Sequence, residues 1–116
     1  MHEYSIVSAL IGQVEAEAAR RHASRVHRLR VQIGELAGVE LELLRTAYMT
    51  FRERTICEVA ELDVELVEAR WICPGCGCAL ARGSLLQCSE CERPARLVQG
   101  DEIVLERIEM EVDDHV

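Results

Sequence analysis

Hydrophobic residues near the start of the chain recur at helical spacing. From Tyr4 to about His22 an apolar side chain returns every three or four residues, and the same period marks a second segment from about Val39 to Arg54. This spacing gathers the apolar side chains on one face of an α-helix. The sequence therefore predicts two amphipathic helices. Their apolar positions are Ile6, Val7, Leu10, Ile11, Val14 and Ala18 in the first helix and Leu43, Leu44, Ala47, Tyr48 and Phe51 in the second.

Three other segments alternate between apolar and polar residues, which is the period of a half-buried β-strand. They are RVHRLRVQIGE from Arg25, with Gly34 ending the strand, ELDVELVEARW from Glu61, and DEIVLERIEMEV from Asp101. In the last segment the alternation changes phase, because Ile103 and Leu105 fall out of step with Ile108. A β-bulge near Arg107 would bring both halves onto one face of a sheet.

Four cysteines form two Cys-x2-Cys pairs before the last of these strands. Cys73 and Cys76 are followed, after eleven residues, by Cys88 and Cys91. Each pair points two sulfurs in the same direction, and two pairs can close a tetrahedron of thiolates around one ion. Because four thiolates leave no open position and zinc has no redox chemistry, the pattern predicts a structural Zn(II) site. A rubredoxin-like iron site uses similar pairs and is the alternative.

The order of the elements predicts the fold class. Helix, strand, helix, strand, cysteine-rich insert and strand make an α+β protein, with a small three-stranded mixed sheet, two helices on one face, and an inserted zinc-ribbon-like subdomain. We expect residues 1–71 and 98–116 to form one α+β domain, and residues 72–97 to form the zinc-binding insert. Only four of the 116 residues are aromatic, so aliphatic side chains must build most of the core.

The charge of the chain limits its partners. Asp and Glu number 21 against 13 basic residues, all of them arginine, which gives a net charge of -8. Nucleic-acid-binding proteins usually present a basic surface, so this balance argues against nucleic acid. No apolar run approaches the roughly 20 residues that cross a membrane, and the polar start MHEYS does not match a secretory leader. We therefore expect a cytoplasmic protein whose reduced cysteines bind metal and do not form disulfides.

The first three residues offer a chelating set for a metal ion. The amine of Met1, the amide nitrogen of His2 and the His2 imidazole can form consecutive chelate rings in one plane. Glu3 could complete the plane through its own amide or its carboxylate. Ni(II) favours a square plane of nitrogen and oxygen donors. Taken alone, a histidine at the second position is most simply an exposed side chain.

Four segments together resemble the HypA/HybF family of hydrogenase maturation factors. They are MHEYSIVSAL at the start, VQIGELAGVE from Val31, the paired cysteine motifs, and GDEIVLERIEMEV near the end, and they span almost the whole chain in the family's order. The resemblance implies a nickel metallochaperone that delivers Ni(II) for maturation of nickel-iron hydrogenase. His2 matches the family's nickel ligand and Glu3 its neighbour in the M-H-E motif. The family's zinc ligands match Cys73, Cys76, Cys88 and Cys91.

The same resemblance implies the partners. They are the GTPase HypB, the precursor of the hydrogenase large subunit and, in some organisms, urease maturation proteins. The transported ion would be Ni(II) and the structural ion Zn(II).

Two other functions fit parts of the sequence. A zinc-ribbon module that binds nucleic acid or protein shares the cysteine pattern, but the net charge of -8 opposes nucleic-acid binding. A small electron carrier with iron at the four cysteines is the second, and its red colour would distinguish it from a colourless zinc protein. An enzyme is least favoured, because the sequence shows no nucleophile-base pair, phosphate-binding glycine loop or open metal site.

Other residues with metal-binding side chains have simpler interpretations. Cys57 is predicted to be a small buried residue and Cys78 a spare thiol. Glu40 lies where some relatives of the family carry an acid near the nickel site, and it is predicted to begin the second helix. Of the remaining histidines, His22 is predicted at a helix end, His27 on the polar face of a strand and His115 in the tail.

Overall fold

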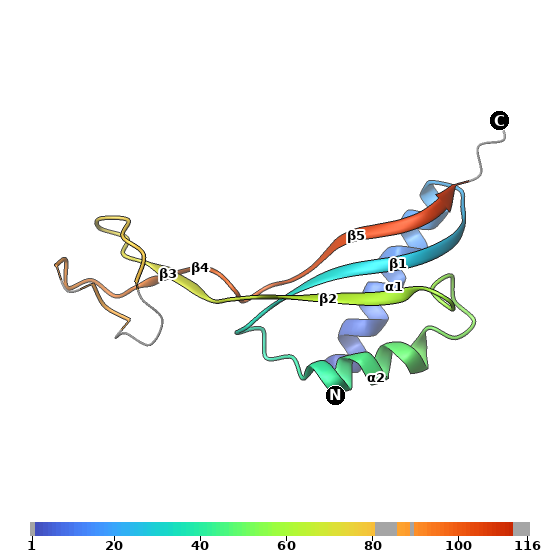
Figure 1. The fold of residues 1–116 in the computed structure, drawn as a ribbon, viewed down its shortest axis with the longest axis horizontal. Coiled ribbons are helices and arrows are strands. Elements are labelled where there is room, and N and C mark those ends of the chain that lie inside the picture. Colours follow the sequence, from blue (N-terminus) through green and yellow to red (C-terminus); the bar gives the residue numbers. More distant parts are fainter. Residues whose placement is uncertain (1, 81–85, 89, 113–116) are drawn as a thin grey trace.

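The computed structural model describes residues 2–80, 86–88 and 90–112, and it places two helices on one face of a three-stranded sheet (Figure 1). The sheet has the order β2-β1-β5, in which β2 runs parallel to β1 and β5 runs antiparallel to it. The predicted α+β class with a mixed sheet is therefore confirmed. The elements are α1 (His2–Arg20), β1 (Ala23–Gly34), α2 (Leu41–Phe51), β2 (Glu61–Val67) and β5 (Ile103–Val112).

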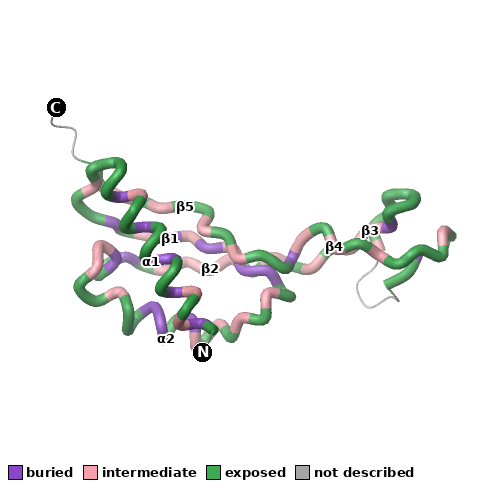
Figure 2. Tube along the Cα trace, turned by 180° about the vertical axis from the view of Figure 1, so that it is seen from behind, coloured by how far each residue is buried: buried purple, intermediate pink, exposed green. Residues whose placement is uncertain are grey.

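The core lies between the helices and the sheet, where Figure 2 shows the buried residues. The predicted apolar faces supply most of it, but Ile6 and Leu43 are only partly buried. Phe51 is 45% exposed, and its ring packs edge-on against Tyr4 with 5.2 Å between ring centroids. The buried side chains of the core are Val7, Leu10, Ile11, Val14, Ala18, Val26, Leu29, Val31, Ile33, Leu44, Ala47, Tyr48, Cys57 and Ala60.

Helix α2 is shorter than the sequence predicts. It begins after Glu40, whose extended backbone makes it the N-cap residue, and it ends at Phe51. Arg52 closes the helix by donating its N–H to the Tyr48 carbonyl at 3.0 Å. Arg54 then adopts a left-handed backbone with φ of 63°, which a continuing helix does not allow.

The predicted bulge in the last strand is confirmed. Arg30 pairs with Arg107 and Val31 pairs with Leu105, so Glu106 has no partner in β1. The extra residue restores the phase of the alternation, and apolar residues on both sides of the bulge face the helices.

The predicted second strand is not continuous. β2 ends at Val67 and the chain resumes as β3 (Arg70–Ile72), which pairs antiparallel with β4 (Arg96–Gln99) in a separate two-stranded sheet. The backbone between them bonds to side chains, because the Ala69 N–H donates to the Glu35 carboxylate at 2.8 Å and the Gln99 amide donates to the Glu68 carbonyl at 3.0 Å. Because the Ala69 N–H and the Glu68 carbonyl bond to side chains, these two groups do not pair with a neighbouring strand.

Two glycines allow the chain to cross itself where the two sheets meet. Gly34 donates its N–H to the Glu102 carbonyl at 2.8 Å, and Leu36 donates its N–H to the Gly100 carbonyl at 2.7 Å. A Cβ atom on Gly34 would lie 2.2 Å from the Gly100 carbonyl carbon. Gly34 ends β1, as predicted, and at this point the backbone of Gly100 lies in contact with it.

The molecule is elongated, with extents of 60 × 34 × 16 Å. The β3-β4 ribbon and the cysteine segment project from one end of the helix-covered sheet (Figure 1). None of the helices in the described part of the chain is long and apolar enough to span a membrane.

Tyr48→Phe is expected to lower the free energy of unfolding by only about 1 kcal/mol. The buried Tyr48 hydroxyl donates to the Ala60 carbonyl at 2.8 Å, but that carbonyl also accepts from the Arg52 guanidinium at 3.0 Å. The carbonyl therefore keeps one partner in the variant. Urea denaturation measures the loss.

A double variant tests this explanation. Tyr48→Phe combined with Arg52→Met leaves the Ala60 carbonyl without either donor, so the combined loss should exceed the sum of the single losses. Simple additivity would contradict a shared role for the two donors.

Candidate metal centres

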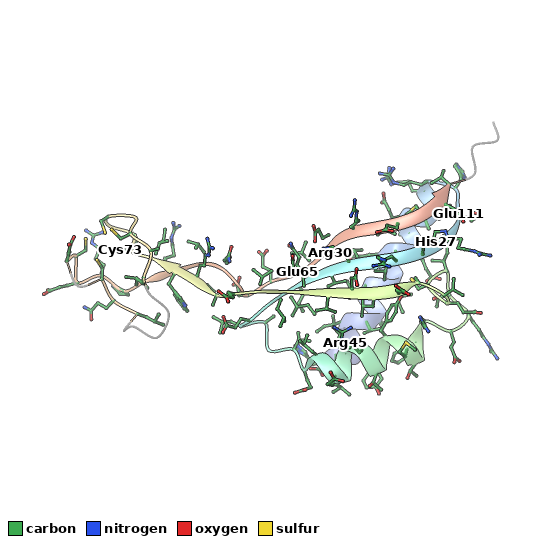
Figure 3. The ribbon with its side chains drawn as sticks, in the orientation of Figure 1. His27, Arg30, Arg45, Glu65, Cys73 and Glu111 are labelled. Carbon is green, nitrogen blue, oxygen red and sulfur yellow. The ribbon has the colours of Figure 1, made fainter. Side chains whose placement is uncertain are left out.

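Four cysteine sulfurs converge at the far end of the ribbon, where Figure 3 labels Cys73. The sulfurs of Cys73, Cys76, Cys88 and Cys91 all lie within 4.8 Å of one another, and those of Cys76 and Cys88 are 3.9 Å apart. Tetrahedral Zn(II) with bonds of about 2.3 Å to sulfur separates its ligand sulfurs by about 3.8 Å. The four predicted ligands therefore lie together, and the spacing of their sulfurs fits an ion of the size of zinc.

The first Cys-x2-Cys turn is closed by backbone hydrogen bonds. Gly77 donates its N–H to the Cys73 carbonyl at 2.8 Å, and Cys73 donates its own N–H to the Cys78 carbonyl at 2.9 Å. Gly77 has a left-handed backbone with φ of 75°, which glycine adopts at little cost. The Gly75 N–H also points at the Cys73 sulfur, 3.3 Å away, and would stabilise a thiolate there.

The second turn repeats this pattern. Glu92 donates its N–H to the Cys88 carbonyl at 2.9 Å, and Cys88 donates its N–H to the Arg93 carbonyl at 3.1 Å. Glu92 occupies the left-handed position, with φ of 54°, at which the first turn has a glycine. The two turns are thus equivalent, and each presents one buried sulfur from its first cysteine.

The neighbouring sulfurs favour the protonated form of Cys91 when no cation is bound. Hydrogen bonds to the sulfurs of Cys73 and Cys76, with a smaller effect of burial, raise the pKa of Cys91 to about 12. A divalent cation reverses this preference, because thiolates that repel one another become ligands and their protons are released. Metal affinity should therefore fall as the pH falls.

The other two cysteines lie outside the cluster. Cys78 is exposed and contributes its carbonyl oxygen, not its sulfur, to the first turn. Cys57 is completely buried in the core, and burial raises the pKa of its thiol. Both placements agree with the interpretations made from the sequence.

The predicted nickel residues begin helix α1. His2 is its first residue and is exposed, whereas Glu3 is 7% exposed. The Glu40 N–H donates to the Glu3 carboxylate at 2.9 Å, and this bond lowers the pKa of Glu3 below its usual value. Met1 lies outside the described residues. The start of α1 is thus joined to the residue that caps α2.

Sequence reasoning missed this use of the Glu3 side chain. The two bonded residues are 37 positions apart, and nothing in either segment indicates that they meet. The structure also keeps the two candidate centres apart, since the N-terminal end lies beside α2 and the cysteines lie at the tip of the ribbon (Figure 1).

The other histidines follow their predicted positions where the structure describes them. His22 lies two residues after the end of α1 and has a left-handed backbone with φ of 56°. His27 lies on the polar face of β1, where its Nε2 atom is 2.8 Å from the Glu111 carboxylate (Figure 3). His115 lies outside the described residues.

Comparison with known families supplies the identification. A family model described as hydrogenase/urease nickel incorporation, metallochaperone, hypA, matches residues 1–110. The chain belongs to the HypA family. That description is of a metallochaperone for nickel incorporation, and it confirms the resemblance stated from the sequence.

Curated relatives and solved structures of the HypA family match this chain over nearly its full length. Hydrogenase maturation factor HypA of Shewanella baltica is 36% identical over 116 residues, covering 98% of this chain and 99% of the relative. The factor of Aquifex aeolicus is 36% identical over 115 residues, covering 97% and 100%. The solution structure of the Ni metallochaperone HypA from Helicobacter pylori aligns with a TM-score of 0.74 at 31% identity, covering 96% of this chain and 98% of that one. A further HypA solution structure has a TM-score of 0.79 at 32% identity, covering 97% and 98%.

Proposed function

We propose that this HypA-family chain carries one Ni(II) ion at its N-terminus and delivers it for maturation of nickel-iron hydrogenase. The observation that best supports this proposal is the bond from the Glu40 N–H to the Glu3 carboxylate. It anchors the start of α1 against the core while the adjacent His2 side chain stays exposed. A metal site needs ligands in fixed positions, and a carrier's site must also be open to its partner. The anchored start of α1 meets the first need and the exposed His2 imidazole meets the second.

The ligands follow from where α1 begins. The first N–H groups of a helix have no acceptor within that helix, so the backbone nitrogens of His2 and Glu3 are not used by α1 itself. Because the Glu3 carboxylate already holds the Glu40 N–H, Glu3 would contribute its amide nitrogen. The Met1 amine and the His2 imidazole complete the proposed square plane.

Release is as necessary as binding for a carrier. The N-terminal end of a helix has a partial positive charge, which opposes a bound cation. This opposition is partly offset by the Glu3 carboxylate. Because the positive helix end weakens the binding of the metal, an acceptor protein can replace its ligands one at a time.

The four-cysteine cluster has a different proposed role. Cys73, Cys76, Cys88 and Cys91 would hold Zn(II), which supplies no redox chemistry and fixes the two turns relative to each other. We assign residues 72–97 to this zinc-binding unit, and residues 1–71 and 98–116 to the nickel-binding unit. The β3-β4 ribbon lies at their junction.

The proposed partners are the GTPase HypB, the hydrogenase large-subunit precursor and urease maturation proteins, in the cytoplasm. Support comes from the family description, which names hydrogenase and urease nickel incorporation, and from curated relatives named as hydrogenase maturation factors. The net charge of -8 supports protein partners over nucleic acid.

A nickel titration of the full, zinc-loaded chain tests the nickel site. The chain with its native Met1 should bind one Ni(II). A version extended before Met1 and a His2→Ala variant should each bind at least about 100-fold more weakly, which is the upper end of losses seen for outer-shell groups. His22→Ala is the matched control, because this exposed histidine follows the opposite end of α1, and it should bind like the native chain.

Two other results would contradict the proposal. Equal binding by all four proteins would place nickel away from the terminus, most simply at the cysteines. No binding by any of them would favour the interaction module with a zinc ribbon.

A further inference from the structure

Strand β5 has one unpaired edge. It pairs with β1 on one side, and within residues 2–80, 86–88 and 90–112 no strand pairs with its other side. An edge of this kind presents free backbone N–H and C=O groups that can pair with an added strand. β5 is ten residues long, compared with seven for β2 at the opposite edge.

A groove of about 770 Å³ lies between this strand and α1. Its α1 wall is polar, with Glu17 paired to Arg20 and Arg21. The side chains of β1 that face the helices, such as Leu29 and Val31, are completely buried. Those of β5 on the same face, Leu105, Ile108 and Met110, are only partly buried, although they line the groove. Figure 2 shows this difference, with buried residues along β1 and only intermediate or exposed ones along β5. The helices therefore cover the centre of the sheet and leave the β5 side of the core uncovered.

The opposite face of β5 is acidic. Glu106 accepts from Arg30 at 3.0 Å, and Arg30 also donates to Glu65 of β2 at 2.9 Å, on the face away from the helices (Figure 3). Between residues 101 and 112 the only basic residue is Arg107. The acids of this segment are Asp101, Glu102, Glu106, Glu109 and Glu111. The edge thus has a groove with apolar side chains of β5 at its floor on one side, and an excess of carboxylates on the other.

We propose that the β5 edge binds an extended segment of a partner protein in which apolar and basic residues alternate, as an added β-strand. Successive side chains of a strand point to opposite faces. The apolar side chains of such a segment would enter the groove over Ile108 and Met110, while its basic side chains would meet Glu109 and Glu111. The backbone of the segment would satisfy the free groups of β5.

A second copy of this chain is the less suitable occupant. Pairing two β5 edges would bring two acid-rich rows together, and the chain has a net charge of -8. Like charges on facing strands destabilise the pair. The bulge at Glu106 also interrupts regular pairing. The stretch 107–112 of β5 has no extra residue of its own, although β1 has two further register shifts opposite it. Charged side chains and bulges commonly prevent sheet edges from pairing with one another. The carboxylates of β5 would nevertheless attract a partner segment that carries basic residues.

Binding of a designed peptide tests this inference independently of nickel. The probe is a capped seven-residue peptide of alternating valine and lysine, added to the zinc-loaded full chain at low salt. NMR should show amide shifts concentrated in 107–112 and the facing residues of α1, with contacts between the two backbones. A valine-glutamate peptide of the same length should not bind, nor should a valine-lysine peptide methylated at alternate backbone nitrogens.

Variants of the chain locate the site. Glu109→Lys should weaken peptide binding about fivefold or more at low salt, because an attraction becomes a repulsion. Met110→Gln should also weaken it by making the floor of the groove polar. Glu53→Lys is the matched control, since it makes the same charge change at an exposed residue just after α2, and it should change affinity less than twofold.

Three results would overturn the proposal. Equal weakening by Glu109→Lys and Glu53→Lys would reduce the binding to net charge. Shifts centred on β2 or the cysteine turns would place the site elsewhere. Concentration-dependent dimers that pair through β5 without peptide would make a second copy the occupant.

Discussion

Replacing Cys73 with serine should abolish zinc binding and unfold the segment around the two cysteine turns, while the helix-covered sheet remains folded. Among the described residues of 72–97, the only buried side chains are Cys73 and Cys88. The buried apolar core consists of residues of the sheet, of its helices and of the connection between α2 and β2. Burial of apolar surface therefore cannot hold this segment, and a structural zinc ion contributes apparent binding free energies of about 10 to 16 kcal/mol.

Metal analysis and NMR together measure this effect. Amide signals of the cysteine segment should collapse toward unfolded positions in Cys73→Ser, and a chelator should do the same to the native chain. Cys78→Ser is the matched control, because Cys78 is exposed and lies outside the four-sulfur cluster. It should keep one zinc per chain. Zinc retained by Cys73→Ser but lost from Cys78→Ser would refute the ligand assignment, and a red protein would indicate iron.

Gly34→Ala should lower the free energy of unfolding by about 3 to 5 kcal/mol, from overpacking and weakened backbone hydrogen bonds. The added Cβ would lie 2.2 Å from the carbonyl carbon of Gly100 and 2.6 Å from the backbone nitrogen of Asp101. Both obstacles are backbone atoms, so no side-chain rotation relieves the clash. The connection between β4 and β5 must move away, which weakens the 2.8 Å bond from Gly34 to Glu102 and the 2.7 Å bond from Leu36 to Gly100.

Gly12→Ala provides the contrast. Gly12 lies inside α1, and a Cβ there would meet nothing within 4 Å. Alanine should raise stability by about 0.5 to 1 kcal/mol, because glycine is the poorer helix former. Urea unfolding of both variants checks the pair. Equal losses for the two substitutions would show that the crossing at Gly34 tolerates a side chain.

Features that depend on neighbouring residues were predictable from the sequence. The apolar periods located both helices and the strands β1 and β5, and a phase change in one segment located the bulge at Glu106. The spacing of Cys73, Cys76, Cys88 and Cys91 is enough to predict that their sulfurs lie together. Period and spacing are properties of a short stretch of chain, so one sequence reveals them.

Other features depend on backbones that meet only after folding. The break between β2 and β3 arises because Glu35 and Gln99 bond the backbone at Ala69 and Glu68. The Glu3 carboxylate reaches Glu40 across 37 positions. The uncovered edge of β5 exists because α1 lies over the centre of the sheet. Local pattern determined the elements and the metal cluster of this protein. Tertiary structure decided where the sheet breaks, what anchors the N-terminus and which edge stays free, because hydrogen bonds between distant segments leave no periodic trace in a sequence.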